Sequence, residues 1–236
     1  MGEMVEFPSN GATASGYLAT PSSGRGPGVI VIQEWWGLVP HIKDVCERFA
    51  REGFVALAPD LFHGKTASLE EPDLAGKLVM EMQLPQAAKE ILAAAMWLID
   101  NERAAGDRVG VVGFCVGGGL ALYATSLSEV FGAVVAFYPG LSRTDAAKAE
   151  YTRIRGAVLG HFAGHDHSYT RDRVAELETQ LQAAGVNVEF FWYEDADHAF
   201  FNDDRPGVYN PEAARLAWER TVAFFRTHLA ITRAPV

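Results

Sequence analysis

Three residues with the side chains needed for acyl transfer occur along this 236-residue chain, in the order Cys115, Asp166, His198. A thiol can attack a carbonyl carbon, an imidazole can take and return the proton, and a carboxylate can orient the imidazole. Each of the three follows a short apolar stretch with the composition of a buried strand. Because the carboxyl ends of parallel strands lie at one edge of a sheet, we expect the three side chains to meet there.

The segment around Cys115 has the pattern of a sharp turn from a strand into a helix. An apolar stretch at 108–113 leads into Gly113-x-Cys115-x-Gly117, and a helical stretch follows. Glycines permit a turn that a larger side chain would block, and this turn lifts the central residue above the sheet. A helix N-terminus also stabilises a thiolate. The alternatives are a buried structural cysteine and a dinucleotide site, but the spacing G-x-G-x-x-G is absent here.

Two later loops supply the acid and the base. Asp166 lies in Gly-His-Asp-His at 164–167, after the apolar stretch at 157–163, and His198 follows the stretch at 188–194. The chain order of nucleophile, acid and base is that of the α/β-hydrolase fold. Two simpler interpretations stay open, because Asp166 could cap a turn and His198 could be a solvated loop residue.

A regular alternation of apolar and amphipathic stretches provides the framework for these residues. Six short apolar stretches have the composition of buried strands, at 28–33, 54–59, 108–113, 133–139, 157–163 and 188–194. A period of about 3.6 residues predicts helices at 40–51, 85–100, 117–127, 171–184 and 211–229. This alternation predicts a single α/β domain over residues 1–236, with a mostly parallel sheet and helices on both faces.

Two segments depart from this alternation. Apolar stretches at 5–7 and 16–20 surround the polar stretch 8–15, which predicts an N-terminal antiparallel hairpin. Residues 63–84 lack a strong period and predict a mobile loop near a ligand. The expected fold is therefore the α/β-hydrolase fold, with this hairpin preceding a mostly parallel sheet.

Composition excludes several classes of protein. The chain is 49% hydrophobic and 21% charged, and its net charge of −10 would repel phosphate backbones and anionic membrane surfaces. We therefore expect a small-molecule substrate, no nucleic acid, no membrane and no cofactor, in a monomer or weak homo-oligomer. The chain has only two cysteines, no apolar run of about 18 residues and no basic leader in residues 1–10. These features predict a cytoplasmic protein.

Several motifs together resemble the dienelactone hydrolase family. They are GFCVGG at 113–118, QEWWG at 33–37, APDLF at 58–62, GHDH at 164–167, and DHAFFNDDRPG at 197–207 followed by PEAARLAWERT. The resemblance covers roughly residues 4–229. Cysteine at the sharp turn, combined with glutamate at an earlier strand end, is far more specific than the turn alone.

The resemblance implies a fourth catalytic residue, Glu34, which would lie beside the thiol. In this family the cysteine is largely unreactive at rest, and substrate binding rearranges cysteine and glutamate so that the thiolate forms. A carboxylate near a thiol does disfavour a second negative charge, although an ordinary ion pair would also explain Glu34. The backbone amides of Trp35 and Val116 match the positions from which the fold builds its oxyanion hole.

The reaction that the resemblance implies is acyl transfer through sulfur. Cys115 attacks an ester or lactone carbonyl, His198 moves the proton with Asp166 fixing its tautomer, and water resolves the thioester. Because a thiolate leaves more readily than an alkoxide or an amine, the intermediate goes forward only with a good leaving group. Enol lactones and activated esters fit this requirement, and amides do not.

One position departs from the family pattern and bears on the substrate. Family members that open dienelactone hold its carboxylate with arginines, including one four residues beyond the catalytic histidine, where this chain has Asn202. Dienelactone is therefore not the expected natural substrate. Arg205, three residues later, could compensate for the missing arginine, but it is interpreted as a solvated charge at the rim. The expected substrate pocket consists of residues near strand ends: Trp36, Phe62, His63, Tyr138, Phe200, Phe201 and Asn202.

Two other functions are alternatives. A metal-dependent hydrolase could use as ligands His161, His165, Asp166 and His167, although their spacing does not force them onto one ion, so no metal is expected. A non-catalytic ligand-binding module is the other alternative, because hydrolase folds can be reused when the chemistry is lost. Cys46 falls in the apolar stripe of the first helix and is expected in the core.

Overall fold

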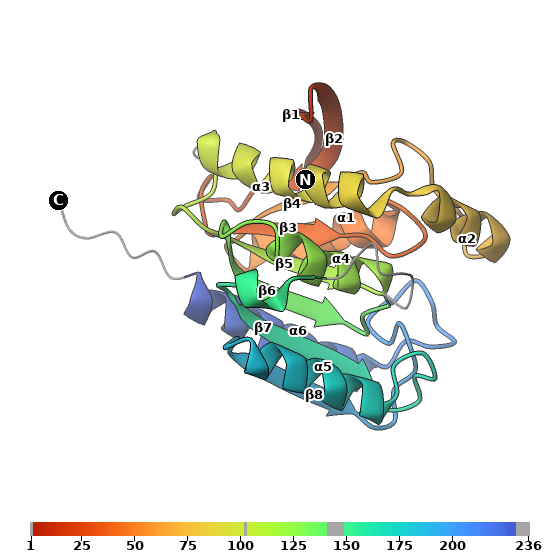
Figure 1. Cartoon of the computed structure of the whole chain (residues 1–236). Coiled ribbons are helices and arrows are strands. Elements are labelled where there is room, and N and C mark those ends of the chain that lie inside the picture. Colours follow the sequence, from red (N-terminus) through yellow and green to blue (C-terminus); the bar gives the residue numbers. More distant parts are fainter. Residues whose placement is uncertain (1, 102, 141–148, 230–236) are drawn as a thin grey trace.

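The computed structural model describes residues 2–101, 103–140 and 149–229. Within these residues the centre is an eight-stranded sheet with the order β1-β2-β4-β3-β5-β6-β7-β8 (Figure 1). The strands are β1 (Glu3–Ser9), β2 (Ala12–Ala19), β3 (Gly28–Ile32), β4 (Val55–Pro59), β5 (Val109–Phe114), β6 (Phe131–Phe137), β7 (Ala157–Ala163) and β8 (Val188–Tyr193). β2 pairs antiparallel with both β1 and β4, and the other neighbours are parallel. The predicted fold class is confirmed.

The N-terminal hairpin turns within two residues, Asn10 and Gly11. Both have positive φ angles, 51° and 78°, as a tight hairpin turn requires. The strands therefore continue through most of the polar stretch 8–15, as far as the pairing of Ser9 with Ala12. Because β1 is an edge strand, its Glu3 and Glu6 side chains are exposed, and the hairpin is longer than the apolar pattern indicated.

Helices cover both faces of the sheet, as the alternation of elements predicted. One face is packed by α1 (Pro40–Arg51) and α6 (Pro211–His228). The other face is packed by α3 (Leu84–Asp100), α4 (Val116–Thr125) and α5 (Arg171–Ala183). A short 3₁₀ helix, η2 (Tyr151–Arg153), precedes β7.

The stretch 63–84 contains a helix, α2 (Pro72–Glu81), where the sequence predicted a loop. Pro72 at the start and Asp73 in the first turn are typical signals of a helix N-terminus. Within this helix only Ala75 and Leu78 are buried, so the apolar pattern spans a single turn and shows no clear period. The prediction of a loop is wrong for this part of the chain.

The carboxyl ends of the parallel strands form one edge of the sheet, with β5 at the centre (Figure 1). The segments that follow β3, β5, β7 and β8 begin at this edge. They carry the four residues predicted to be catalytic: Glu34, Cys115, Asp166 and His198. The fold thus brings together residues that are far apart in the chain.

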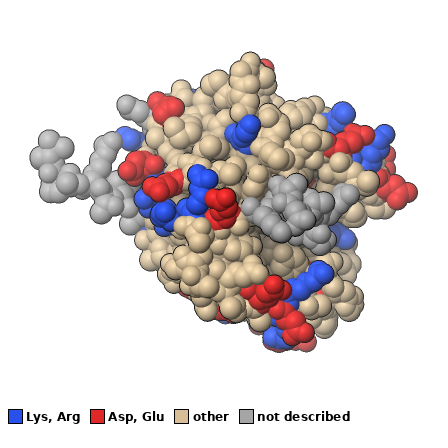
Figure 2. Space-filling model, in the orientation of Figure 1, with Lys and Arg blue, Asp and Glu red and all other residues tan. Residues whose placement is uncertain are grey.

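The described surface carries charges of both signs. On the face shown in Figure 2, acidic and basic side chains lie next to one another in small clusters separated by uncharged surface. None of the described helices combines the length and the apolar character needed to cross a membrane.

Candidate active site

Cys115 occupies the sharp turn between β5 and α4. It is the N-cap of α4, and its backbone has φ 55° and ψ −122°, a conformation that L residues rarely adopt. Its N–H donates to Phe137 O at 3.1 Å, and its carbonyl oxygen accepts from Gly118 N at 2.9 Å and Gly140 N at 2.8 Å. These bonds hold the strained backbone in place, which is typical of functional sites.

The glycines on either side of Cys115 are required by close backbone approach. A Cβ atom on Gly113 would lie 2.0 Å from Gly117 O, and a Cβ on Gly117 would lie 2.4 Å from Gln33 O. Both distances are far inside van der Waals contact, so larger residues would push the turn apart. The structure therefore has the tight strand-to-helix turn that the glycine spacing predicted.

The predicted acid and base are brought together by the loops that follow β7 and β8. His165 N donates to Ala196 O at 3.0 Å, which joins the two loops. His198 Nδ1 lies 2.5 Å from Asp166 Oδ2. The other oxygen of Asp166 accepts from the backbone N–H of Ser168 at 2.8 Å, so the carboxylate is held from two sides.

The protonation states of this pair follow from their contacts. Burial raises the pKa of Asp166, but hydrogen bonds from His198 and from backbone amides outweigh burial and lower this pKa, so the carboxylate is ionised at neutral pH. Burial lowers the pKa of His198, but Asp166 and the negative charge of a Cys115 thiolate raise this pKa to about 10. The imidazole can therefore hold a proton between the carboxylate and the sulfur.

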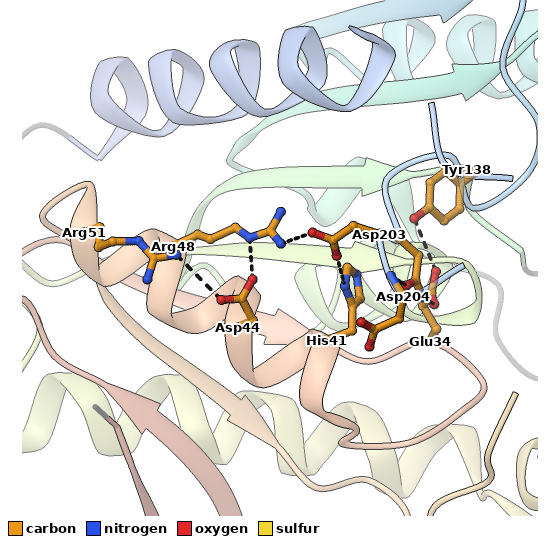
Figure 3. Close-up of polar contacts among 9 residues, drawn as sticks. Glu34, His41, Asp44, Arg48, Arg51, Tyr138, Asp203 and Asp204 are labelled. Atoms are coloured by element: carbon orange, nitrogen blue, oxygen red, sulfur yellow. Dashed lines mark hydrogen bonds and ion pairs between the residues drawn. The ribbon is translucent and has the colours of Figure 1, made fainter. Parts of the chain in front are cut away.

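Glu34 follows β3, and both of its carboxylate oxygens are hydrogen-bonded. The residue is 2% exposed. Its Oε1 accepts from the hydroxyl of Tyr138 at 3.3 Å (Figure 3), and its Oε2 accepts from Asn202 Nδ2 at 2.7 Å. Both donors are neutral, and no ion pair among the described residues involves Glu34. An ordinary ion pair therefore does not explain this buried carboxylate.

Tyr138 directly follows β6, which is the neighbour of β5, the strand that precedes Cys115. Its φ is 34°, and it is fully buried. Burial, together with the charges of Glu34 and Cys115, raises the pKa of Tyr138 well above its usual value, so the phenol stays protonated and can donate to Glu34. Its ring centre lies 5.0 Å from that of His198. One sequence feature could have indicated this role, namely a hydroxyl at the end of an otherwise apolar strand.

A cavity of about 530 Å³ contains these groups, a size within the range of small-molecule sites. Its described lining consists of Glu34, Trp35, Cys115, His165, Asp166, His167, Ser168, Asp197, His198, Ala199, Arg205 and Val208. All four residues predicted to be catalytic therefore reach one space that a substrate could enter.

The two backbone amides predicted to bind an oxyanion are close to the nucleophile in the fold. Trp35 follows Glu34 and lines the cavity, and Val116 is the first residue of α4, directly after Cys115. An N–H at the first helical position has no acceptor within its own helix. Among the described loop and side-chain acceptors, neither amide has a hydrogen-bond partner. Both N–H groups are thus available to a ligand.

The aromatic side chains predicted to form the pocket lie elsewhere. Five of the predicted pocket residues are at most 3% exposed and lie in the packed interior: Trp36, Tyr138, Phe200, Phe201 and Asn202. Phe62 and His63 face a separate cavity of about 190 Å³ beside α2 and α3. Rings at strand ends turn inward because they stack on one another, as Phe201 does on Phe114 at 5.3 Å. None of the seven predicted pocket residues lies in the described wall of the catalytic cavity.

The described wall of the catalytic cavity combines ionisable side chains with the apolar residues Trp35, Ala199 and Val208. His165 and Asp197 lie across from one another there, with His165 Nδ1 3.5 Å from Asp197 Oδ1. Arg205 is half-buried, and its guanidinium lies 5.8 Å from the ring centre of Trp36. Within the described residues, Arg205 forms no ion pair. Arg205 is therefore part of the cavity wall, which corrects its interpretation as a solvated charge at the rim.

The four residues considered as metal ligands do not converge. His161 is buried, with Tyr193 OH 2.9 Å from its Nδ1 and Thr221 Oγ1 3.0 Å from its Nε2. Burial and the charge of Arg220 lower the pKa of His161 to about 3, so this imidazole is neutral. His165 belongs to the cavity wall instead. No group of three or more His, Cys, Asp or Glu in the described chain has a geometry suited to a metal ion.

Comparison with known proteins relates this site to a family. The model of the Dienelactone hydrolase family matches residues 14–229, a range that includes all four candidate catalytic residues. The chain belongs to the dienelactone hydrolase family. The predicted resemblance is confirmed, and the protein is a dienelactone hydrolase-like hydrolase.

Individual relatives of this family member match nearly the whole length of the chain. Protein usf of Aquifex pyrophilus is 40% identical over 238 residues, covering 97% of this chain and 100% of the relative. A protein of Aquifex aeolicus (strain VF5), provisionally named carboxymethylenebutenolidase, is 38% identical over 236 residues, with coverage of 97% and 100%. The crystal structure of a provisionally named dienelactone hydrolase from Klebsiella pneumoniae subsp. pneumoniae MGH 78578 has a TM-score of 0.85 at 29% identity, with coverage of 95% and 98%.

Proposed function

We propose that this family member is a cysteine-dependent hydrolase of lactones or activated carboxylic esters that acts through a thioester acyl-enzyme. The observation that carries the proposal is the position of Cys115, which lies at the strained turn above the sheet and shares a cavity with the Asp166–His198 pair. Glu34 lines the same cavity. A set this complete supports catalysis over the alternative of a non-catalytic ligand-binding module.

The proposed reaction begins when the Cys115 thiol gives its proton to His198, whose Nδ1 is held by Asp166. The sulfur attacks the carbonyl carbon, the carbonyl π electrons move to oxygen, and the amides of Trp35 and Val116 bind the oxyanion. When the carbonyl re-forms, the C–O bond to the leaving group breaks, and the leaving oxygen takes the proton from His198. An alcohol or enol and a thioester result.

Hydrolysis of the thioester uses the same groups. His198 takes a proton from water as the water oxygen attacks the thioester carbon. When the carbonyl re-forms, the C–S bond breaks and a carboxylic acid is released. The sulfur takes the proton from His198, which returns both residues to their starting state. Because sulfur leaves more readily than an alkoxide or an amine, acylation goes forward only when the leaving oxygen is stabilised. Enol lactones and activated esters meet this condition.

Glu34 restrains the thiol in this mechanism until substrate binds. Its hydrogen-bond partners, Tyr138 and Asn202, are neutral, so its negative charge is not cancelled by a cation. That charge opposes formation of a thiolate at Cys115 in the absence of substrate. Substrate binding would rearrange Cys115 and Glu34, as the family resemblance implies, and so release the nucleophile.

The proposed substrate is a small ester or lactone with a polar or anionic group that Arg205 can contact in the cavity wall. Asn202 is 1% exposed and hydrogen-bonded to Glu34, so it does not replace the carboxylate-binding arginine of the family. Arg205 is the single Arg or Lys in the described wall, whereas the family holds the carboxylate of dienelactone with more than one arginine, so dienelactone itself is not the substrate that we propose.

Two further expectations accompany this function. Both cysteines are free thiols, which supports a reducing compartment such as the cytoplasm. All the proposed catalytic residues come from one chain, so a monomer or a weak homo-oligomer would be sufficient for catalysis.

The test compares Cys115→Ala with Cys46→Ala on p-nitrophenyl esters of several chain lengths, enol lactones and dienelactone. Cys115→Ala is expected to lower kcat/KM by about 10⁴-fold or more, because the nucleophile is lost. Cys46 is fully buried in α1, and burial raises the pKa of its thiol, so Cys46→Ala should keep kcat/KM within about twofold. Full activity of Cys115→Ala, or loss of activity in Cys46→Ala alone, would contradict the proposal.

A further inference from the structure

A polar cluster joins α1 to the loop that follows His198 (Figure 3). His41 Nδ1 lies 3.0 Å from Asp203 Oδ1, and Arg48 donates to the other oxygen of Asp203. Arg48 Nε also donates to Asp44 Oδ2 at 2.6 Å. We call His41, Arg48 and Asp203 the α1 clamp. No residue of the α1 clamp lies in the described wall of the catalytic cavity.

The contacts of the α1 clamp define its protonation. Burial raises the pKa of Asp203, but Arg48 and His41 outweigh burial and lower this pKa, so the carboxylate is ionised. Because a carboxylate can only accept, His41 Nδ1 carries a hydrogen and donates it. The His41 side chain is 1% exposed, and its Nε2 has no hydrogen-bond partner among the described residues. Among the described residues, Asp203 is thus the hydrogen-bond partner of this buried ring.

Asp203 is the chain neighbour of Asn202, the residue that donates to Glu34. The amide nitrogen of Asn202 donates to Glu34 Oε2 at 2.7 Å, and its amide oxygen accepts from Asp204 N at 3.1 Å. The second contact fixes which end of the amide faces Glu34. Because α1 begins at Pro40, shortly after Glu34, the α1 clamp ties this loop to the same segment that carries Glu34.

The His41 ring also packs between the residues that precede two functional positions. Its centre lies 6.5 Å from the ring of Phe114, the residue before Cys115, and 6.2 Å from the ring of Phe201, the residue before Asn202. Because interiors are close-packed, displacement of His41 would shift the backbone on both sides of the site.

We infer that the α1 clamp is a positioning device that fixes Asn202 on Glu34 and so sets the geometry of Glu34 beside Cys115. This inference rests on the proposed function. The residues of the α1 clamp are positioning residues, because they act through the Asn202–Glu34 hydrogen bond and lie outside the described lining of the cavity. Loosening the clamp therefore lowers kcat and leaves KM nearly unchanged, since the cavity wall stays intact.

The test is a double-mutant cycle between Asp203→Ala and Glu34→Gln in the full-length protein, with an activated ester as substrate. Glu34→Gln alone is expected to lower kcat by about 10²-fold with the fold preserved, because the rearrangement of Cys115 and Glu34 that forms the attacking thiolate needs the carboxylate. Asp203→Ala alone is expected to lower kcat by about tenfold, with KM within about twofold of wild type. Because both changes act on one contact, Asp203→Ala in the Glu34→Gln background should lower kcat by less than about twofold.

Asp44→Ala is the matched control. Asp44 holds Arg48 from within α1, but it does not contact the loop that carries Asp203. Its removal should leave kcat within about twofold, because Asp203 still holds Arg48 and the Asp44 side chain is 46% exposed. Arg48→Met is a second variant, which keeps the His41–Asp203 contact, and it should lower kcat less than Asp203→Ala does. Arg48→Met takes the place of Asp203→Ala in the cycle if thermal unfolding shows that Asp203→Ala is not folded.

Three outcomes would overturn the inference. They are wild-type kcat in both clamp variants, a loss confined to KM, and a full additional loss when a clamp variant is combined with Glu34→Gln. Failure of the proposed function would be recognised separately, because Cys115→Ala would then keep its activity and Glu34→Gln would turn over at the wild-type rate.

Discussion

Two histidine–aspartate pairs in this protein have similar geometry at Nδ1 and different surroundings at Nε2. His198 Nδ1 lies 2.5 Å from Asp166, and His41 Nδ1 lies 3.0 Å from Asp203. The His198 ring and Cys115 line the same catalytic cavity. The Nε2 atom of His41 is buried and has no polar partner in the described part of the chain.

This difference shows that an imidazole–carboxylate pair does not by itself make a catalytic base. A base also needs a path from its second nitrogen to the nucleophile and the substrate. The loops after β7 and β8 provide that path for His198, because they end at the edge of the sheet where Cys115 lies. His41 has no such path, so we infer that its pair with Asp203 positions Asn202 on Glu34 and does not transfer protons.

The largest effect is expected when the first pair loses its imidazole. His198→Ala should lower kcat/KM by about 10⁴-fold, because proton transfer to and from the thiol is lost. Added imidazole should restore part of the rate, since the vacated position adjoins the cavity. Initial rates with and without imidazole test this prediction. A wild-type rate without imidazole would remove His198 from the mechanism.

A smaller effect is expected at the second pair. His41→Phe keeps a ring against Phe114 and Phe201 but removes the bond to Asp203, and it should lower kcat by about tenfold. Added imidazole should not restore the rate, because the position is sealed from the cavity. Rescue by imidazole, or a loss as large as that of His198→Ala, would make the two pairs equivalent and contradict the comparison.

The smallest effect concerns stability rather than rate. The pKa of His198 is raised from 6.5 to about 10, so its contribution to folding is complete below pH 6.5 and is lost as the pH rises through about 10. The pKa of Asp166 is lowered from 3.8, so its contribution is present above that pH and is lost as the pH falls. The pair should therefore stabilise the fold most between about pH 4 and pH 6.5.

Urea unfolding of wild type and Asp166→Asn at several pH values tests this window. The variant should lose most free energy of unfolding between about pH 4 and pH 6.5, and the difference from wild type should shrink toward pH 10. A difference that does not change with pH would show that the pair is not ionised in the folded protein.

The arrangement of the four candidate catalytic residues could be predicted because each has a local signal in the sequence. The glycines before and after Cys115 predict the turn, and Asp166 and His198 lie in the loops that follow apolar strands. The sheet could be predicted for the same reason, since strands buried on both faces are continuously apolar. Among residues 2–101, 103–140 and 149–229, the hairpin turn and α2 differed from the predicted framework, because Asn10 and Gly11 shorten the turn and α2 buries too few side chains to show a period.

The contacts around these residues could not be predicted, because they join distant parts of the chain. Tyr138 reaches Glu34 across 104 residues, and His41 reaches Asp203 across 162 residues. The direction of a side chain at a strand end depends on such partners. The aromatic residues were therefore expected in the pocket, whereas Phe201 stacks on Phe114 in the core and the described wall has Arg205 beside Trp35 and Val208.

The most direct test of the central claim is to locate the acyl group after wild-type protein is mixed with p-nitrophenyl acetate and quenched with acid. A cysteine nucleophile predicts an acetyl group on the peptide that contains Cys115, released by hydroxylamine at neutral pH as a thioester is. The acetyl group should be absent from Cys115→Ala. An acetyl group on a different residue, together with wild-type turnover by Cys115→Ala, would contradict the proposed mechanism.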